Sequence, residues 1–470
     1  MSSRPYSPGF CAMISDRPYY HVIKVRNATS SDHLLRVIGY AVENSATSCS
    51  ATCCLEYICC KFGAHIRYLR LRGSLCTMEL STLLSSCTEL QHVVCSHIDT
   101  AIQVEGLCLL LNQKRGRLQI LEFQNCRFSE CGLLKIKGSL MASDYRLLLR
   151  HLFVHSSQTL LIRSSEYFLR FLQSCSYLQS LVLIDNQVDL ATVSDLLSMI
   201  VTRMPHLSLF HVRENELTGL ALPFPSSFHT NNLSSLKALD VRSNNINLQD
   251  LEEFLPYFDF MPSLKLLNIS DNPIGDDGLI ALLPVLQGLQ LSELSLSACN
   301  LSMKGVCSLF DVIISSDHSL RSLSISQNFL SSSIAAPLAN FLRFGMVERL
   351  DLGEIGLGMD GCLALQSALN KMPRLSHFIL RKNRIGSAGA ALISKLVATP
   401  NALKEIDLSS NLLDKQCLQS VASYLESLQG GMLELVDLRN NLAEESKIFE
   451  NIKKPQVLLS EVGKFYDDDP

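Results

Sequence analysis

Tryptophan is absent from the 470-residue sequence, and neither sign of charge dominates it: 41 lysines and arginines stand against 45 aspartates and glutamates, for a formal net charge of −4. Without a long basic stretch, binding to nucleic acid is not expected. No apolar run approaches the roughly 18 uninterrupted residues of a membrane helix, and the N-terminal run MSSRPYSPGFCAMISDRPYY lacks the apolar segment of a secretory signal. These absences predict a cytoplasmic protein that does not insert into membranes, with a nuclear location as the alternative.

Short catalytic motifs are missing as well. The sequence contains no G-x-x-x-x-G-K-[ST] phosphate loop, no G-x-S-x-G nucleophile elbow and no H-E-x-x-H zinc motif. We therefore expect no enzyme activity, no catalytic residues, no cofactor and no metal site. The function is predicted to lie in binding.

A repeated pattern fills most of the chain. Around Asn272, the residues Leu264, Leu267, Ile269 and Ile274 fit the pattern L-x-x-L-x-L-x-x-N-x-L. Its first position recurs at residues 66, 90, 118, 149, 178, 207, 236, 264, 291, 320, 347, 375, 403 and 433, a mean step of about 28 residues. This step lies within the period of roughly 20–29 residues that leucine-rich repeats have.

The order of residues within one repeat predicts a strand followed by a helix. Leu267 and Ile269 alternate along an extended run, so they face a core while their neighbours face the opposite way. The leucines after Asn272 recur at helical spacing and are predicted to cover the same core. Because its amide carries both donors and acceptors, Asn272 is expected to satisfy backbone groups in the turn and to link neighbouring repeats.

Not every repeat has the asparagine. Cys126 and Cys299 occupy the equivalent position in two of them, and Ile98 and Ile355 occupy it in two others. An isoleucine side chain forms no hydrogen bond, so the turns at Ile98 and Ile355 are predicted to differ locally.

These residues resemble the ribonuclease-inhibitor-like subfamily of leucine-rich repeats, in which each repeat contains a full helix and cysteine commonly replaces the asparagine. The resemblance implies an α/β solenoid, or horseshoe, of about 14 repeats, with parallel strands on the concave face and helices on the convex face. The repeat array is predicted to cover residues 65–443. Residues 1–64 are predicted to form an N-terminal arm and helical cap, and residues 444–470 a C-terminal closing segment and tail.

The predicted cap rests on two apolar runs. From Ser31, the runs DHLLRVIGYAVE and CCLEYICCKFG favour two helices that would cover the first hydrophobic layer of the array. An adaptor helix pair like that of F-box proteins is the alternative interpretation of the same segment.

Seventeen cysteines are present, and the densest group runs from Cys49 to Cys60. One interpretation is a zinc site, with the candidate ligands Cys49, Cys53, Cys54, Cys59, Cys60 and His33. However, the spacing C-x3-C-C-x4-C-C is not the paired C-x2-C arrangement of zinc sites. We therefore expect these cysteines to act as small buried side chains.

Residues 218–235 break the repeat. Pro223 and Pro225 forbid a regular helix there. The favoured interpretation is a non-helical crossover whose aromatic residues fill the core, and the alternative is a recognition loop that presents Phe224 and Phe228.

The strand residues that flank the inner leucines are predicted to face outward on an open surface, where a partner can dock. The candidate partner-binding residues are His211, Arg213, Asp240, Arg242, Asn268, Ser295, Ser324, Arg349, Asp351, His377, Arg381, Asp407, Asp437 and Arg439. Since adjacent strands lie roughly 4.8 Å apart, Asp240 is expected to reach Arg213, and Asp351 to reach Arg381. Two charged patches separated by a floor of serines are predicted.

The resulting hypothesis is a non-catalytic scaffold or adaptor that binds a protein partner through the concave face. The alternative is a GTPase-activating regulator that resembles Ran GTPase-activating protein, although the long acidic stretch typical of that family is represented here only by Asp467, Asp468 and Asp469. Stimulated GTP hydrolysis in a panel of small GTPases would favour the alternative.

Overall fold

The computed structural model describes most of the chain in two compact units, Met1–Leu236 and Lys237–Pro470. The described residues are 20–26, 34–40, 63–73, 76, 84–114, 117–141, 148–157, 165–215, 217, 233–315, 320–344, 347–369, 374–398, 402–427, 432–442, 446–449, 452 and 455–459. In the following, Met1–Leu236 is unit 1 and Lys237–Pro470 is unit 2.

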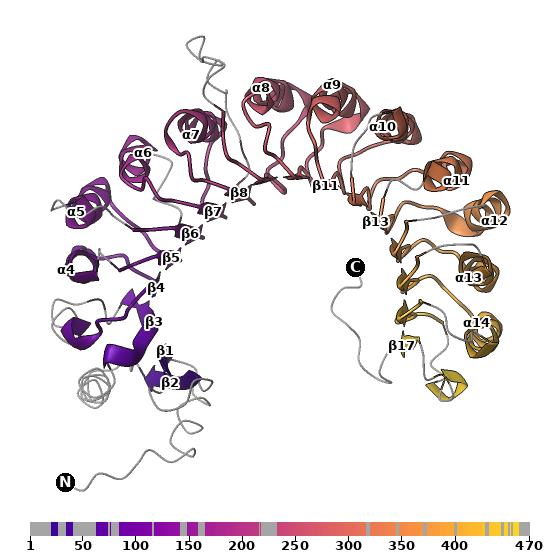
Figure 1. Ribbon diagram of the computed structural model, residues 1–470, viewed down its shortest axis with the longest axis horizontal. Coiled ribbons are helices and arrows are strands. Elements are labelled where there is room, and N and C mark those ends of the chain that lie inside the picture. Colours follow the sequence, from indigo (N-terminus) through magenta and orange to yellow (C-terminus); the bar gives the residue numbers. More distant parts are fainter. Residues whose placement is uncertain are drawn as a thin grey trace, which may run out of the picture. The chain divides into compact units, whose positions relative to one another are not determined.

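Unit 1 contains a parallel sheet with helices on its outer side (Figure 1). The parallel strands, which pair in chain order, are β3 (Ile66–Arg72), β4 (His92–Ser96), β5 (Ile120–Gln124), β6 (His151–His155), β7 (Ser180–Ile184) and β8 (Leu209–Arg213). The helices are α4 (Ala101–Lys114), α5 (Glu130–Met141), α6 (Ser165–Gln173) and α7 (Leu190–Arg203), with short 3-10 helices at Gly63–His65 and Leu84–Ser86.

The N-terminal cap differs from the prediction. The strand β1 (Tyr20–Arg26) pairs antiparallel with both β2 (Leu34–Tyr40) and β3. The helix predicted from Ser31 is therefore wrong over Leu34–Tyr40. The run LLRVIGY is short and rich in residues that favour strands, and periodicity alone does not separate such a run from a helix. The second predicted helix and the group of cysteines from Cys49 to Cys60, with His33, lie outside the described residues.

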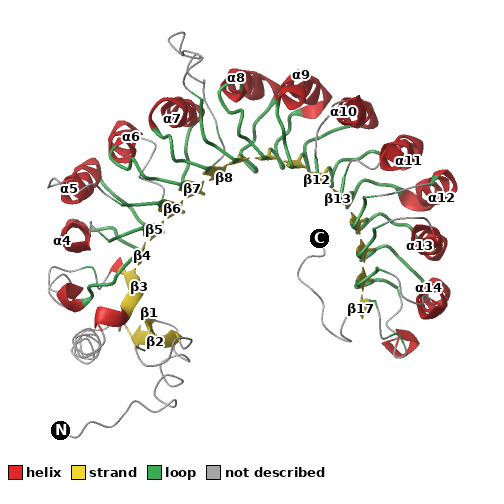
Figure 2. Ribbon diagram, viewed as in Figure 1, coloured by secondary structure: helices red, strands yellow, loops and turns green. Residues whose placement is uncertain are grey.

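Unit 2 repeats the same arrangement with shorter strands (Figure 2). Its strands all pair in parallel and in chain order: β9 (Ala238–Asp240), β10 (Leu266–Asn268), β11 (Glu293–Ser295), β12 (Ser322–Ser324), β13 (Arg349–Asp351), β14 (His377–Ile379), β15 (Glu405–Asp407), β16 (Leu435–Asp437) and β17 (Gln456–Leu458). The last strand, β17, lies in the segment predicted only to close the array.

The helices of unit 2 lie outside its curved row of strands. They are α8 (Leu248–Phe258), α9 (Gly275–Gly288), α10 (Met303–Ser315), α11 (Ala335–Phe344), α12 (Gly358–Ala368), α13 (Ala388–Ala398) and α14 (Lys415–Ser427), with short 3-10 helices at Ser332–Ile334 and Ser446–Phe449. In the described part of the chain, no helix has both the length and the apolar character needed to cross a membrane. The fold is thus an α/β solenoid in each unit, as predicted from the repeats.

The core lies between the strands and the helices. Leu267 and Ile269 are almost completely buried, as the strand pattern predicts. Leu279, Leu282 and Leu286 of α9 are buried as well. Full burial of one such side chain contributes roughly 1.5–3 kcal/mol. Because every repeat contributes similar residues, the core continues along each array without a single centre.

The asparagines form a second, polar ladder inside this core. The side-chain oxygen of the fully buried Asn272 accepts hydrogen bonds from the backbone N–H groups of Asn244 (3.0 Å) and Ile246 (2.9 Å), in the preceding repeat. Its amide nitrogen donates to the carbonyl oxygens of Val241 (3.0 Å) and Ile269 (2.7 Å). The predicted role of this asparagine, to satisfy the turn and link repeats, is confirmed.

Two repeats without the asparagine replace its hydrogen bonds in different ways. The Cys299 thiol donates weakly to the carbonyl oxygens of Ile269 and Ser297, and so replaces the donor of an amide but not its acceptor. At Ile355 the backbone carbonyl oxygen accepts from the N–H groups of Leu330 and Ser331, and a 3-10 helix follows at Ser332–Ile334. The local difference therefore lies in the turn of the preceding repeat, whereas the turn at Ile355, which was predicted to differ, keeps the usual bonds of the Ile355 and Leu357 N–H groups to Asn383 Oδ1.

Candidate functional site

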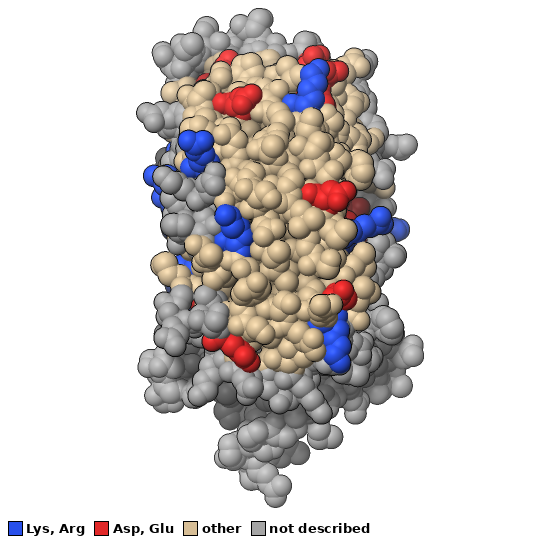
Figure 3. Space-filling view, turned by 90° about the vertical axis from the view of Figure 1, so that its right-hand side faces the viewer, with Lys and Arg blue, Asp and Glu red and all other residues tan. Residues whose placement is uncertain are grey.

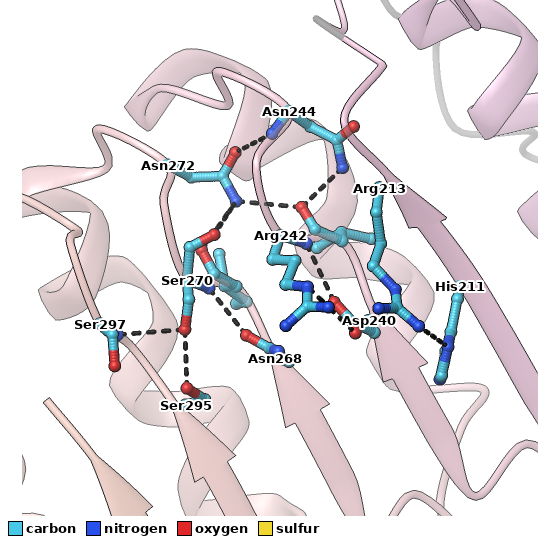
Figure 4. Close-up of polar contacts among 12 residues, drawn as sticks. His211, Arg213, Asp240, Arg242, Asn244, Asn268, Ser270, Asn272, Ser295 and Ser297 are labelled. Carbon is cyan, nitrogen blue, oxygen red and sulfur yellow. Dashed lines mark hydrogen bonds and ion pairs between the residues drawn. The ribbon is translucent and has the colours of Figure 1, made fainter. Parts of the chain in front are cut away.

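The predicted partner-binding residues of unit 2 lie on the open face of its strands, here called the inner wall. Arg349 and Arg381 are exposed, whereas Arg242, Asn268, Ser295, Ser324, Asp351, His377, Asp407 and Arg439 are half-buried. Asp240 and Asp437, although they also point out of the sheet, are 5% and 6% exposed. In unit 1, His211 and Arg213 are half-buried on the open face of β8, where the Arg213 guanidinium lies 2.8 Å from His211 Nδ1 (Figure 4).

A local hydrogen bond explains why acidic side chains on the inner wall are buried. Asp240 Oδ1 accepts the backbone N–H of Arg242, two residues further on, at 3.2 Å. The same bond is formed by Asn268, Asp351, Asp407 and Asp437, each at the end of its strand. These side chains therefore complete the turn after the strand and are held in fixed positions. Sequence reasoning missed this role, although the recurrence of Asp or Asn at one position of the repeat is visible in the sequence.

Two arginines of the inner wall pair with an aspartate of their own repeat. Arg439 Nε and Nη2 bind the Asp437 carboxylate at 3.0 Å and 2.6 Å in a two-pronged contact. Arg242 Nε lies 3.9 Å from Asp240 Oδ2 (Figure 4). These pairs connect residues two apart in the chain, and not neighbouring strands as predicted.

The expected contact between Asp351 and Arg381 is not formed. Asp351 accepts instead from the Ser324 hydroxyl (3.2 Å) and the Gly353 N–H (3.0 Å), and within the described residues no ion pair of 4.0 Å or less joins it to Arg381. The expected contact between Asp240 and Arg213 would join the two units, and it stays a prediction.

The predicted serine floor is a hydrogen-bonded network across the three repeats of β10, β11 and β12. Ser270 and Ser295 share a hydroxyl contact of 2.7 Å (Figure 4). Ser297 lies 2.7 Å from Ser324, and the Ser326 hydroxyl donates to Ser297 at 2.9 Å. Because these side chains are small and bonded to one another, the middle of the inner wall is a shallow polar surface.

Burial changes the acidity of one carboxyl on this wall. Desolvation raises the pKa of Asp407 above its ordinary value, and the nearby Asp437 charge acts in the same direction. Hydrogen bonds from Ser409 and the charge of Arg381 oppose the rise. The inner wall therefore holds a carboxylate whose charge is costly in the folded state.

Unit 1 presents a different open face, on which sequence reasoning named only the last strand. Strand β6 turns His151, Phe153 and His155 outward while Leu152 and Val154 are buried. The rings of His151 and Phe153 stack with centroids 6.4 Å apart. An aromatic side chain thus stands on this face, and the alternation H-L-F-V-H was the signal that could have identified it.

An ionic cluster lies next to this aromatic pair. The Glu122 carboxylate of β5 lies 3.9 Å from His92 Nε2 and 3.7 Å from His155 Nε2. The interaction with the nearby His92 is the main cause of a lowered pKa at Glu122, which burial opposes. Among the described residues, no group of three or more histidine, cysteine, aspartate or glutamate side chains has the geometry to hold a metal ion.

The repeat pattern and the solenoid geometry agree with comparisons to known sequences. The family model described as "Leucine Rich repeat" matches residues 232–255 and 260–283, which contain Asn244 and Asn272. The chain is a leucine-rich repeat protein. The eleven cysteines of this leucine-rich repeat protein that the structure describes are all free, and nine of them are buried.

Among curated relatives, NACHT, LRR and PYD domains-containing protein 3 of Homo sapiens is 29% identical over 205 residues, which cover 42% of this chain and 20% of that protein. Protein 14 of the same series, from Mus musculus, is 32% identical over 150 residues, covering 30% of this chain and 15% of that protein. Protein 12 of the series, from Homo sapiens, is 26% identical over 303 residues, covering 63% of this chain and 28% of that protein. This leucine-rich repeat protein therefore matches only about a fifth of the length of these relatives.

Two solved structures align with much of this chain. A chain from the crystal structure of the Rad7 and Elc1 complex in yeast aligns with 74% of this chain and 81% of its own length, at 13% identity and a TM-score of 0.43. A chain from the crystal structure of the TLR13–ssRNA13 complex aligns with 83% of this chain and 57% of its own length, at 16% identity and a TM-score of 0.44. These likenesses concern the fold alone.

Proposed function

We propose that this leucine-rich repeat protein is a non-catalytic scaffold or adaptor that binds a protein partner through the open faces of its sheets. The supporting observation is the contrast along each strand: apolar side chains are buried on one side, and polar side chains held by hydrogen bonds stand on the other. A surface whose side chains are already fixed loses little conformational entropy when a partner binds.

The open face also offers the chemical variety that specific protein recognition needs. The inner wall of unit 2 combines arginines, carboxylates and serine hydroxyls, and the open face of unit 1 adds Phe153 with its stacked His151. Aromatic and arginine side chains are the types that most often dominate the energy of protein interfaces.

Site-specific photo-crosslinking tests this proposal. A photoreactive amino acid is placed at Ser270 or Ser322 on the inner wall and, as a matched control, at Gln419 or Ser367 on the helix side. None of the four residues is buried, so the substitutions leave the core intact. We expect discrete adducts with the same protein partner only from the inner wall. Adducts of that partner formed solely from Gln419 or Ser367 would contradict the proposal, because they would place the partner on the helices.

A further inference from the structure

The inner wall of unit 2 contains two arginines without an ion pair. Arg349 and Arg381 are exposed, and within the described residues neither side chain has an anionic partner within 4.0 Å. In contrast, Arg242 and Arg439 on the same wall each contact an aspartate of their own repeat. Arg349 and Arg381 are therefore the cations on the wall that remain available to an incoming group.

Gly353 allows Arg381 to lie across the wall. A Cβ atom at Gly353 would stand 2.9 Å from Cγ and 3.0 Å from Nε of Arg381, closer than side chains tolerate. The equivalent residue of the preceding repeat is Ser326, and that of the following repeat is Arg381 itself. Because glycine leaves this space open, the side chain of Arg381 lies beside Gly353, in the preceding repeat.

The serine network has a defined direction. Asp351 can only accept, so Ser324 donates to it and must accept from Ser297, which in turn accepts from Ser326. Each of these hydroxyl hydrogens forms a hydrogen bond within the wall. The floor therefore presents free lone pairs, which suit the N–H groups of an approaching backbone, while the arginines supply donors for acidic side chains.

The spacing of the two arginines fits an extended chain. Arg381 Nε lies beside Gly353, four residues beyond Arg349, and four residues of extended chain span about 13 Å. Carboxylates at positions i and i+4 of an extended segment have nearly the same separation.

We propose that the inner wall between β11 and β14 binds an extended acidic segment of a protein partner, with one carboxylate on Arg349 and a second, four residues further along, on Arg381. The backbone of that segment lies on the serine floor. This inference rests on the proposed scaffold function and names the chemistry of its partner. A continuous polyphosphate backbone suits this part of the wall less well, since Glu293 on β11 and Asp351 on β13 interrupt its positive charge.

Fluorescence anisotropy tests this inference with a labelled Gly/Ser peptide that carries two glutamates four residues apart. The same peptide with glutamines is the ligand control. The variant R349A/R381A removes the two arginines of the wall that have no ion pair, and the matched control R343A/K304A removes two exposed cations from the helices α11 and α10. Figure 3 shows one side of the molecule, on which charged residues of both signs are scattered. Lys304 lies on α10 and Arg343 on α11, not on the strands of the inner wall, so the control changes net charge without altering the wall.

We expect R349A/R381A to weaken binding of the glutamate peptide at least about tenfold and R343A/K304A to change it less than about twofold. The variant G353A keeps both charges but displaces Arg381, and we expect it to weaken binding about threefold. Unchanged melting temperatures show that all variants fold.

Several outcomes would overturn the inference. They are equal binding of the glutamate and glutamine peptides, equal losses in the two double variants, or tighter binding of a labelled oligouridylate that depends on the same arginines. If the peptide fails while photo-crosslinks from Ser270 and Ser322 persist, the acidic segment is wrong and the scaffold function stands. If those crosslinks are absent as well, the proposed function itself fails.

Discussion

At the scale of single residues, the repeats of β4 to β16 share a backbone position in the left-handed region. The residue just before the asparagine position has a positive φ in each of them, for example Asp271 (57°), Ala298 (51°) and Lys382 (54°). A residue with a Cβ atom pays roughly 1–2 kcal/mol for this conformation. The strain is tolerated because the N–H of Ala298 continues the ladder to the carbonyl oxygen of Ser326, at 2.9 Å.

Replacing Ala298 with glycine tests this strain. We expect Ala298→Gly to raise the free energy of unfolding by about 0.5–1 kcal/mol, because glycine adopts the left-handed region without a Cβ clash, although its unfolded state has more entropy. The matched control is Ala364→Gly in the middle of α12, which should lower the free energy of unfolding by a similar amount. Denaturant unfolding of both variants measures the difference, and a loss of stability in Ala298→Gly would contradict the strain.

The raised pKa of Asp407 gives a prediction about pH. A carboxyl whose pKa is higher in the folded than in the unfolded state binds its proton more tightly when folded, so its charge destabilises the fold at neutral pH. Asp407→Asn keeps the acceptor for the Ser409 N–H and removes that charge.

We therefore expect Asp407→Asn to melt a few degrees higher than the natural protein at pH 7. The gain should shrink as the pH falls toward about 4, because the natural carboxyl then becomes neutral. The exposed Glu426→Gln, on α14, serves as the control for loss of one negative charge. A gain that is constant between pH 7 and 4 would rule out ionisation as its cause.

At the scale of elements, the sequence predicts strands and helices well where a period is sustained and poorly where it is not. The first positions of the repeats at residues 66 to 433 correspond to β3–β16. The agreement arises because apolar residues at every second strand position must all face the same core, which fixes the direction of the strand. Strand β2 was missed because LLRVIGY is too short to show a period, and β17 because QVL stands alone without an asparagine turn after it.

The assignment of strand faces can be tested by two adjacent leucines. Leu267 is fully buried, whereas Leu266, beside it in β10, is half-buried on the open face. We expect Leu267→Asp to lose more than about 4 kcal/mol and to unfold its array, because a carboxylate would enter the core. Leu266→Asp should lose less than about 1.5 kcal/mol. Circular dichroism melts of the two variants decide, and similar melting temperatures would refute the inward direction of Leu267.

At the scale of the whole molecule, the candidate site was only partly predictable. Period two identifies which strand residues face away from the core, and twelve of the fourteen predicted residues are exposed or half-buried. It does not show which of them the fold uses for itself: Asp240 and Asp437 are buried because they bond to the following turn, a contact set by backbone conformation. The predicted residues also divide between the units, with His211 and Arg213 in unit 1 and the rest in unit 2.

This division makes the contribution of each unit to partner binding measurable. Arg213→Glu reverses a charge on unit 1 and Arg242→Glu reverses one on unit 2, so the variants are compared singly and together for capture of the partner that photo-crosslinking identifies. If both open faces contact the partner, each variant should weaken capture and the losses of binding free energy should add within about 0.5 kcal/mol. Arg242→Glu places a second carboxylate near the buried Asp240, so Arg242→Gln is its control for folding. Full capture by the folded double variant would remove both arginines from the interface, and a loss confined to one variant would assign the partner to that unit alone.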